Sequence, residues 1–180
     1  MKKVLVTGGA GFVGSHLVKY LLEIGDYDIV VFDRLSHHSL QNCEKNVVYF
    51  KGNILSEKDV TEVFKKYGPF VTVFHLVSAM PNKEVSDSLL WETNVSGTQN
   101  LISEAVKNKT KSFVFTSSNV VYGIPKMLPA KEESPLDTLE IYGKSKAKAE
   151  KVLADFKKDI NIQIIRCPVI AGVGRLGLQA

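Results

Sequence analysis

Short apolar runs alternate along the chain with longer segments whose apolar residues recur at helical spacing. The apolar runs, which predict strands, are Lys3–Thr7, Tyr27–Phe32, Val47–Phe50, Val71–Leu76, Ser112–Thr116 and Ile162–Arg166. The helical segments are Phe12–Ile24, Glu57–Lys66, Val85–Val106 and Leu139–Lys157. Strands that are apolar on both faces and joined by helices are typical of a buried parallel sheet. The pattern therefore predicts an α/β fold, a doubly wound parallel sheet with helices on both faces.

Local signals refine two of the helix starts and one connection. Ser56 precedes the second helical segment and is a good N-cap residue. Asp137 with Glu140 three residues later resembles a capping box before the last helical segment. The stretch Gly123–Pro135 contains three prolines and is predicted to be a loop. Because it is too short to link two domains, we expect it to cover the functional site.

Composition and charge narrow the class of protein. The 180 residues are 44% hydrophobic and 23% charged, which suits one globular domain. No apolar run approaches the ~20 residues of a membrane span, and the first one ends too early for a signal peptide, so we expect a cytoplasmic protein without a membrane partner. The net charge of +4 suits an anionic small ligand. The charges are dispersed, so nucleic acid is not an expected partner, and the spacing of Cys43 and Cys167 predicts no metal site.

A glycine-rich segment, T-G-G-A-G-F-V-G, joins the first predicted strand to the first predicted helix. Gly8 permits a tight turn, Gly11 lets a pyrophosphate approach the backbone, and Gly14 lets the helix pack closely on the strand. The amide groups near Phe12 and Val13 then face phosphates at a helix N-terminus. The context predicts a dinucleotide-binding turn. A glycine turn without a ligand is the plainer alternative.

The residues after the second strand bear on the choice of cofactor. Asp33 ends that strand about 20 residues after the glycines, where a carboxylate can accept hydrogen bonds from the adenosine ribose. An acid there repels a 2′-phosphate, which favours NAD over NADP. Arg34 follows directly and could accept that phosphate, so NADP stays possible.

Tyr142 and Lys146 are spaced i, i+4, which places both side chains on one face of a helix. A nearby ammonium stabilises a phenolate and lowers the pKa of the tyrosine. Ser117 and Ser118 follow the fifth strand, at the edge where such sheets bind ligands. The alternative is an exposed tyrosine beside a solvated lysine.

The glycine turn, Ser118, the V-Y-G sequence that ends at Gly123, Tyr142 and Lys146 together resemble the extended short-chain dehydrogenase/reductase superfamily. Within it they resemble the NAD-dependent epimerase/dehydratase group, which acts on nucleotide sugars. The resemblance covers almost the whole chain and implies a Rossmann-type NAD(P)-binding domain over residues 1–174. Residues 175–180 would then begin a substrate-binding region that is cut short.

The resemblance also implies roles for individual residues. Tyr142 would act as general base and acid, Lys146 would lower its pKa and hold the nicotinamide ribose, and Ser118 would share the hydrogen bond of the substrate hydroxyl. The implied cofactor-binding residues are Gly8, Gly11, Phe12, Val13, Gly14, Asp33, Arg34, Asn53, Ile54, Leu76, Val77, Ser78, Asn94, Ser117, Tyr142, Lys146 and Pro168. This chain departs from the family pattern at Asn53, Val77 and Ser78. The departures at Val77 and Ser78 put the close packing of these two residues along the cofactor in question.

The implied activity is the NAD-dependent epimerisation of a nucleotide sugar, by proton abstraction and hydride transfer to the nicotinamide. Asn119 and Val120 stand where the dehydratases and decarboxylases of this group carry acids, which ranks those reactions lower. An alcohol or ketone dehydrogenase/reductase, and a cofactor-binding fragment without turnover, remain alternatives. A homodimer through the two long helices is also implied, with Trp91 either at that contact or packed on the sheet. His75 is expected to be structural.

Overall fold

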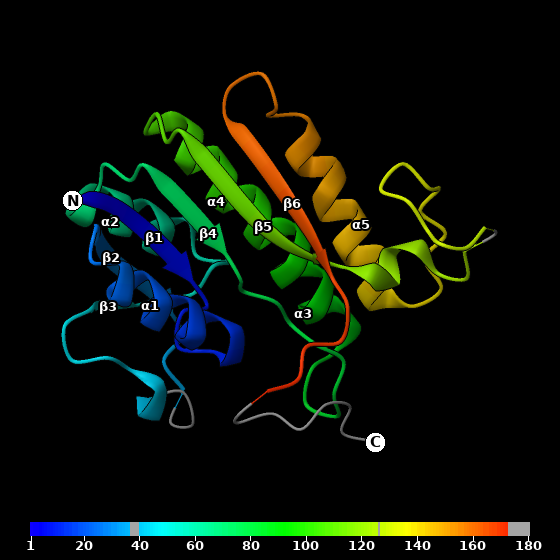
Figure 1. Cartoon of the computed structure of the whole chain (residues 1–180), viewed down its shortest axis with the longest axis horizontal. Helices are drawn as coiled ribbons and strands as arrows, with labels where there is room; N and C mark the ends of the chain where they lie inside the picture. The colour runs from blue at the N-terminus through cyan, green and yellow to red at the C-terminus, as the bar shows by residue number, and fades with distance from the viewer. Residues whose placement is uncertain (37–39, 126, 173–180) are drawn as a thin grey trace.

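The computed structural model describes residues 1–36, 40–125 and 127–172, in which parallel strands form one twisted sheet (Figure 1). The strands follow the order β3-β2-β1-β4-β5-β6. Their bounds are β1 Lys2–Thr7, β2 Tyr27–Asp33, β3 Val48–Lys51, β4 Thr72–His75, β5 Ser112–Ser118 and β6 Asn161–Cys167. The chain winds first toward β3 and then back toward β6, so the switch point lies between β1 and β4. The predicted doubly wound sheet is confirmed.

The helices divide unequally between the two faces of this sheet (Figure 1). One face carries α1, Phe12–Ile24. The other carries α2 Glu57–Tyr67, α3 Asp87–Trp91, α4 Gly97–Lys107 and α5 Ile141–Ala154. A right-handed crossover places its helix on one face when the chain moves one way along the sheet, and on the other face when it moves back. The single helical crossover toward β3 therefore leaves α1 alone on its side.

The face that α1 occupies is less covered over β5 and β6, whereas Phe74 on β4 still packs against the core under α1. Phe74, Val114 and Gln163 are neighbours across β4, β5 and β6 on that side. Ile165 on β6 is 48% exposed, although it is aliphatic. Among the described residues no helix packs over β5 and β6 on this side, so α1 alone covers this face, and the predicted helices on both faces are confirmed.

The predicted long helix Val85–Val106 is divided by an irregular turn. A π-helical segment, η2 (Glu92–Ser96), lies between α3 and α4. Single π-turns inside helices occur often at functional sites. Nearby, Leu90 and Val95 are buried, and Trp91 packs against the main core. No exposed large apolar side chain of the described residues lies on α4 or α5, so the dimer contact stays a prediction.

The two predicted helix caps have different outcomes. The Ser56 hydroxyl accepts a hydrogen bond from the Asp59 amide at 3.2 Å, which confirms the cap of α2. The capping box at Asp137 and Glu140 is wrong. Glu140 is itself the N-cap of α5, its side chain makes no capping hydrogen bond, and the helix begins only at Ile141.

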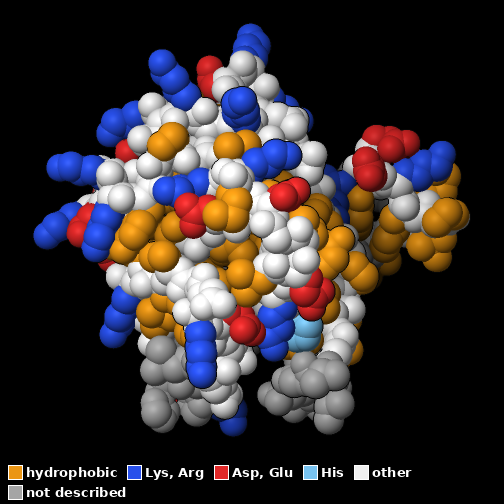
Figure 2. Space-filling model, turned by 60° about the vertical axis from the view of Figure 1, so that its left-hand side comes forward, with side chains coloured by type: hydrophobic (Ala, Val, Ile, Leu, Met, Phe, Trp, Pro, Cys, Tyr) orange, Lys and Arg blue, Asp and Glu red, His pale blue; other side chains and the backbone are white. Residues whose placement is uncertain are grey.

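The segment between β5 and α5 begins with the short helix η3 (Asn119–Tyr122) and leaves the body as an arm, described over residues 123–125 and 127–140 (Figures 1 and 2). Gly123 has a φ of +60°, and the Asp137 carbonyl oxygen occupies the space where a Cβ would stand, so the two ends of the arm meet. Figure 2 shows apolar side chains on it, among the exposed ones Ile124, Leu128 and Leu139. The arm projects beside α5, whereas we expected a loop over the site.

None of the helices in the described part of the chain has the length and apolar character to cross a bilayer.

Candidate functional site

The glycine-rich turn lies at the carboxyl end of β1, and backbone crowding explains its glycines. Gly8 has a φ of +72°, and a Cβ there would lie 2.9 Å from the Val77 amide nitrogen. A Cβ on Gly14 would overlap the Gly8 carbonyl oxygen and lie 2.6 Å from the Cα of Gly9. The Gly11 amide closes the turn by donating to the Gly8 carbonyl at 3.0 Å. Side chains at positions 8 and 14 would therefore open the turn.

Helix α1 begins directly after this turn and presents its positive end to the carboxyl edge of the sheet. Its N-cap is Gly11, which has no capping side chain, and its first turn, which holds Phe12 and Val13, contains no acid. The first amide groups of a helix have no carbonyl partner within it, and the macrodipole adds positive charge there. This end of α1 is suited to an anion such as a phosphate.

Asp33 lies where β2 ends, beside the glycine turn. Its Oδ2 accepts from the Ala10 amide at 3.2 Å and its Oδ1 from the Leu35 amide at 2.9 Å. Each carboxylate oxygen has a further lone pair, so hydroxyl groups of a ligand can still donate to it. Arg34 beside it is exposed. The carboxylate therefore stands beside the glycine turn, and its contact with a ribose stays a prediction.

Asn53 and Ile54 follow β3 and mainly shape the start of α2. The Asn53 amide donates to Asp59 Oδ2 at 2.8 Å, and Asn53 Oδ1 accepts from the Leu55 amide at 3.1 Å. Ile54 is 3% exposed and belongs to the core. Any contact of Ile54 with a cofactor would involve its backbone, and the predicted roles of both residues stay predictions.

The segment after β4 passes close to the glycine turn. The Leu76 amide donates to the Thr7 carbonyl at 3.1 Å, and the Val77 backbone lies against Gly8. The backbones thus approach closely although Val77 and Ser78 depart from the family pattern. The Ser78 hydroxyl is 3.4 Å from Asn94 Oδ1, which connects this segment to η2.

Asn94, in η2, uses its amide group to hold protein elements together. Its Oδ1 accepts from the Ala79 amide at 2.8 Å, and its Nδ2 donates to the Ala79 carbonyl and to Ser145 Oγ at 2.9 Å. Ser145 Oγ donates in turn to the Tyr142 carbonyl at 2.7 Å. Sequence reasoning missed Ser145, because nothing marks a buried serine in a helical pattern. Asn94 therefore positions the segment after β4 against α5.

Tyr142 and Lys146 share one face of α5, and Lys146 is deeply buried. Lys146 is 1% exposed, and its Nζ lies 4.6 Å from the centre of the Phe115 ring. Burial lowers the pKa of Lys146 to about 7, although the neighbouring Cys167 and Glu150 favour the charged form. An amine that titrates near neutral pH is typical of functional sites.

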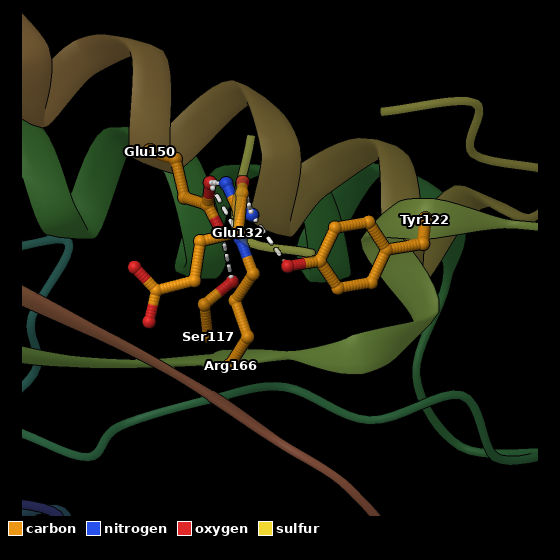
Figure 3. A network of polar contacts seen from close by, with 5 residues as sticks. All are labelled: Ser117, Tyr122, Glu132, Glu150 and Arg166. Carbon is orange, nitrogen blue, oxygen red and sulfur yellow. Dashed lines mark hydrogen bonds and ion pairs between the residues drawn. The ribbon is translucent and has the colours of Figure 1, made fainter. Parts of the chain in front are cut away.

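The remaining predicted residues lie at the ends of β5 and β6. The Ser118 hydroxyl is half-buried and accepts from the Val120 amide at 3.4 Å. Pro168 is exposed just beyond β6. The Ser117 hydroxyl points the other way and donates to Glu150 Oε1 at 2.5 Å (Figure 3). The Ser117 side chain is thus bound to α5, and no role in holding a cofactor follows from its placement.

His75 is structural, as expected. It is fully buried, its Nδ1 accepts from the Thr7 hydroxyl at 2.7 Å, and its Nε2 donates to Thr98 Oγ1 at 2.9 Å. The Thr98 hydroxyl itself donates to the Asn94 carbonyl, which assigns the single ring proton to Nε2. Burial, with a smaller effect of Lys146, lowers the pKa of His75 to about 3.

This histidine predicts a pH-dependent stability. The unfolded chain takes up a proton near pH 6.5 and the folded chain does so only near pH 3, so stability falls as the pH drops below 6.5. Between pH 6.5 and 4.5 the loss from His75 should be roughly 2.5 kcal/mol, at about 1.4 kcal/mol per pH unit. Urea unfolding at both pH values should show a smaller loss for His75→Gln. Equal losses in the two proteins would contradict this account.

Among the residues that the structure describes, no three His, Cys, Asp or Glu side chains are grouped so that they could hold a metal ion.

Comparisons with known proteins agree with this geometry. A profile of the NAD dependent epimerase/dehydratase family matches residues 4–177. UDP-glucose 4-epimerases of Dictyostelium discoideum and Arabidopsis thaliana are 34% and 35% identical, over 85% and 86% of this chain. These matches cover 46% and 47% of the two relatives, so the chain spans about half their length.

Solved structures give the same picture. The UDP-glucose 4-epimerase of Thermotoga maritima with UDP-glucose superposes with a TM-score of 0.84 at 29% identity. The enzyme of Thermus thermophilus with NAD superposes with a TM-score of 0.83 at 31% identity. Each comparison covers 91% of this chain and 54% of the other. By its sequence and its fold, the chain belongs to the NAD-dependent epimerase/dehydratase family.

Proposed function

We propose that this chain is the cofactor-binding and catalytic part of an NAD-dependent nucleotide-sugar epimerase. The observation that carries the proposal is the buried Lys146 on the same face of α5 as Tyr142, at the carboxyl edge that also holds the glycine turn. Similarity to UDP-glucose 4-epimerases supports a nucleotide sugar as the substrate.

The residues at this edge fit a dinucleotide. Gly8 and Gly14 permit the tight backbone packing that closes the turn, the N-terminus of α1 suits the pyrophosphate, and the Asp33 carboxylate suits the adenosine ribose. The carboxylate would repel a 2′-phosphate, which favours NAD. When bound, NAD supplies the hydride acceptor that such a reaction needs.

The chain's own residues would carry out the proton transfer of the reaction. Tyr142 would take the proton of the sugar hydroxyl and later return it. With a pKa lowered to about 7, Lys146 still carries its proton in part of the molecules at neutral pH, and that ammonium can stabilise the Tyr142 phenolate. Ser118 would hold the same hydroxyl by a hydrogen bond. Asn119 and Val120 provide no acid or base for an elimination, which favours epimerisation over dehydration.

A second candidate is a cofactor-binding fragment without turnover of its own. Two observations favour it: the face of β5 and β6 that no helix of the described residues covers, and a span of about half the relatives' length. Such a fragment would lack any substrate contacts that the relatives make with their additional residues.

Binding and turnover measurements separate the two candidates. Calorimetry with the purified chain should show NAD binding at least tenfold tighter than NADP, and UDP-glucose with NAD should yield UDP-galactose by NMR. Binding of NAD without conversion of UDP-glucose would favour the fragment. Failure to bind either dinucleotide would overturn both candidates.

A further inference from the structure

One buried polar network stands beside the site without a part in the proposed reaction (Figure 3). At its centre the Glu150 carboxylate, on α5, accepts hydrogen bonds from two strands. Ser117 Oγ donates to Oε1 at 2.5 Å, Arg166 Nε donates to Oε1 at 3.1 Å, and Arg166 Nη2 donates to Oε2 at 2.8 Å. The side chain of Glu150 is 6% exposed and that of Arg166 is 21% exposed. Two N–H groups of the guanidinium thus donate to the two carboxylate oxygens, and this bidentate geometry is the strong form of an ion pair.

Arg166 extends the network from β6 to the arm. Its Nη1 donates to Tyr122 Oη and to the Glu132 carbonyl, each at 2.7 Å. Its guanidinium also stacks on the Tyr122 ring, with Cζ 4.9 Å from the ring centre. One arginine thus joins β6, η3, the arm and α5.

The network contacts the elements that carry the proposed catalytic side chains. Glu150 follows Lys146 by one helical turn and Tyr142 by two, so all three share a face of α5. Ser117 directly precedes Ser118 on β5. The Ser117–Glu150 hydrogen bond therefore sets how far the Tyr142–Lys146 face lies from Ser118.

We propose that Glu150 and Arg166 are positioning residues for Tyr142, Lys146 and Ser118, which they hold in register by fixing α5 to the ends of β5 and β6. The proposal rests on the proposed function, because it assigns these residues to the same catalytic group. Neither Glu150 nor Arg166 needs to touch the substrate or the cofactor.

Energetics favour a task beyond stability. Replacing a buried ion pair by well-packed apolar residues is often neutral or stabilising, so the pair is a poor means of holding a fold together.

The charges around Lys146 give Glu150 a specific effect. Cys167 and, to a smaller extent, Glu150 favour the charged form of Lys146, and of these two groups Glu150 is the carboxylate. His75 borders Lys146, and Tyr142 shares its helix face. Removal of that carboxylate takes away one of the groups that favour the Lys146 ammonium, which weakens the positive charge beside Tyr142.

The test is a titration of the Tyr142 phenol. Its phenolate absorbance in the near ultraviolet is obtained by subtracting the spectrum of the same protein with Tyr142→Phe. We expect Glu150→Gln to raise the Tyr142 midpoint by about one pH unit, a tenfold change in the ionisation constant. Glu150→Asp keeps the charge and should restore at least half of the shift. A purely structural pair would lower the melting temperature and leave this midpoint unchanged.

A matched control and a second variant keep the outcomes distinct. Glu104 on α4 is also a mostly buried carboxylate, with a side chain 13% exposed and an ion pair to Lys107, but it lies at the other end of the sheet. Glu104→Gln should leave the Tyr142 midpoint unchanged. If Glu150→Gln does not fold, Ser117→Ala takes its place, because it removes the hydrogen bond that fixes α5 to the end of β5, and an unchanged midpoint in that variant overturns the proposal. A wild-type Tyr142 that titrates like free tyrosine would instead overturn the proposed function.

Discussion

Replacing Gly14 with alanine should both destabilise the chain and abolish its binding of NAD. The new Cβ would collide with the Gly8 carbonyl oxygen and the Gly9 Cα, which are backbone atoms held by the closed turn. Overpacking of this kind typically costs about 1–3 kcal/mol, and more where the backbone cannot move aside. A turn displaced by about 1 Å would misalign the phosphate-binding amides, for which we expect at least a hundredfold loss of affinity.

Gly25 provides the matched control. It has a φ of +79°, but no atom lies within 4 Å of the position a Cβ would take. Gly25→Ala should therefore cost only the ~1–2 kcal/mol of a left-handed residue and leave NAD affinity unchanged. Urea unfolding and calorimetry on both variants measure the two effects. NAD binding by Gly14→Ala at wild-type affinity would refute the assignment of the turn.

Tyr142→Phe should remove turnover while the cofactor site stays intact. The substitution deletes one oxygen and keeps the half-buried ring, so the melting temperature and the NAD affinity should change little. Proton transfer by a positioned side chain contributes about 10²–10⁴-fold, and we expect a loss of at least 10³-fold in the rate of epimerisation.

Tyr20→Phe is the control for this substitution, because Tyr20 is 60% exposed on α1. That variant should keep full activity under the same assay. Turnover retained by Tyr142→Phe would contradict the proposed role of the phenol. Joint loss of folding and NAD binding would assign Tyr142 a structural role.

Much of the fold could be predicted because the decisive signals are local. The β-branched runs, the helical spacing after Phe12 and the Ser56 cap each depend on a few neighbouring residues. The glycine turn was also predictable, because steric crowding permits so few residue types there. Asp33 was proposed from its spacing of about 20 residues after the glycines, and the Tyr142–Lys146 pair from its i, i+4 spacing and the family resemblance.

The errors arose where distant residues compete with a local signal. The capping box at Asp137 failed because the base of the arm packs Asp137 against Gly123. The π-turn in η2 could not be predicted, because the sequence there has a regular helical pattern. Strict alternation in β5 could have shown that Ser117 faces α5 together with Phe113 and Phe115, since these positions are the buried ones. The partners Glu150 and Arg166 come from separate elements, and no local pattern links them.

Lys146 has a consequence for any attempt to engineer this chain. The Lys146 ammonium is buried under the sheet against the face of the Phe115 ring. This burial lowers the stability of the folded state, as the lowered pKa of Lys146 indicates. A library ranked by heat resistance would therefore be expected to reward methionine or leucine at position 146. On the proposed function, such a screen would enrich more stable proteins that had lost activity, so it needs a paired assay of turnover.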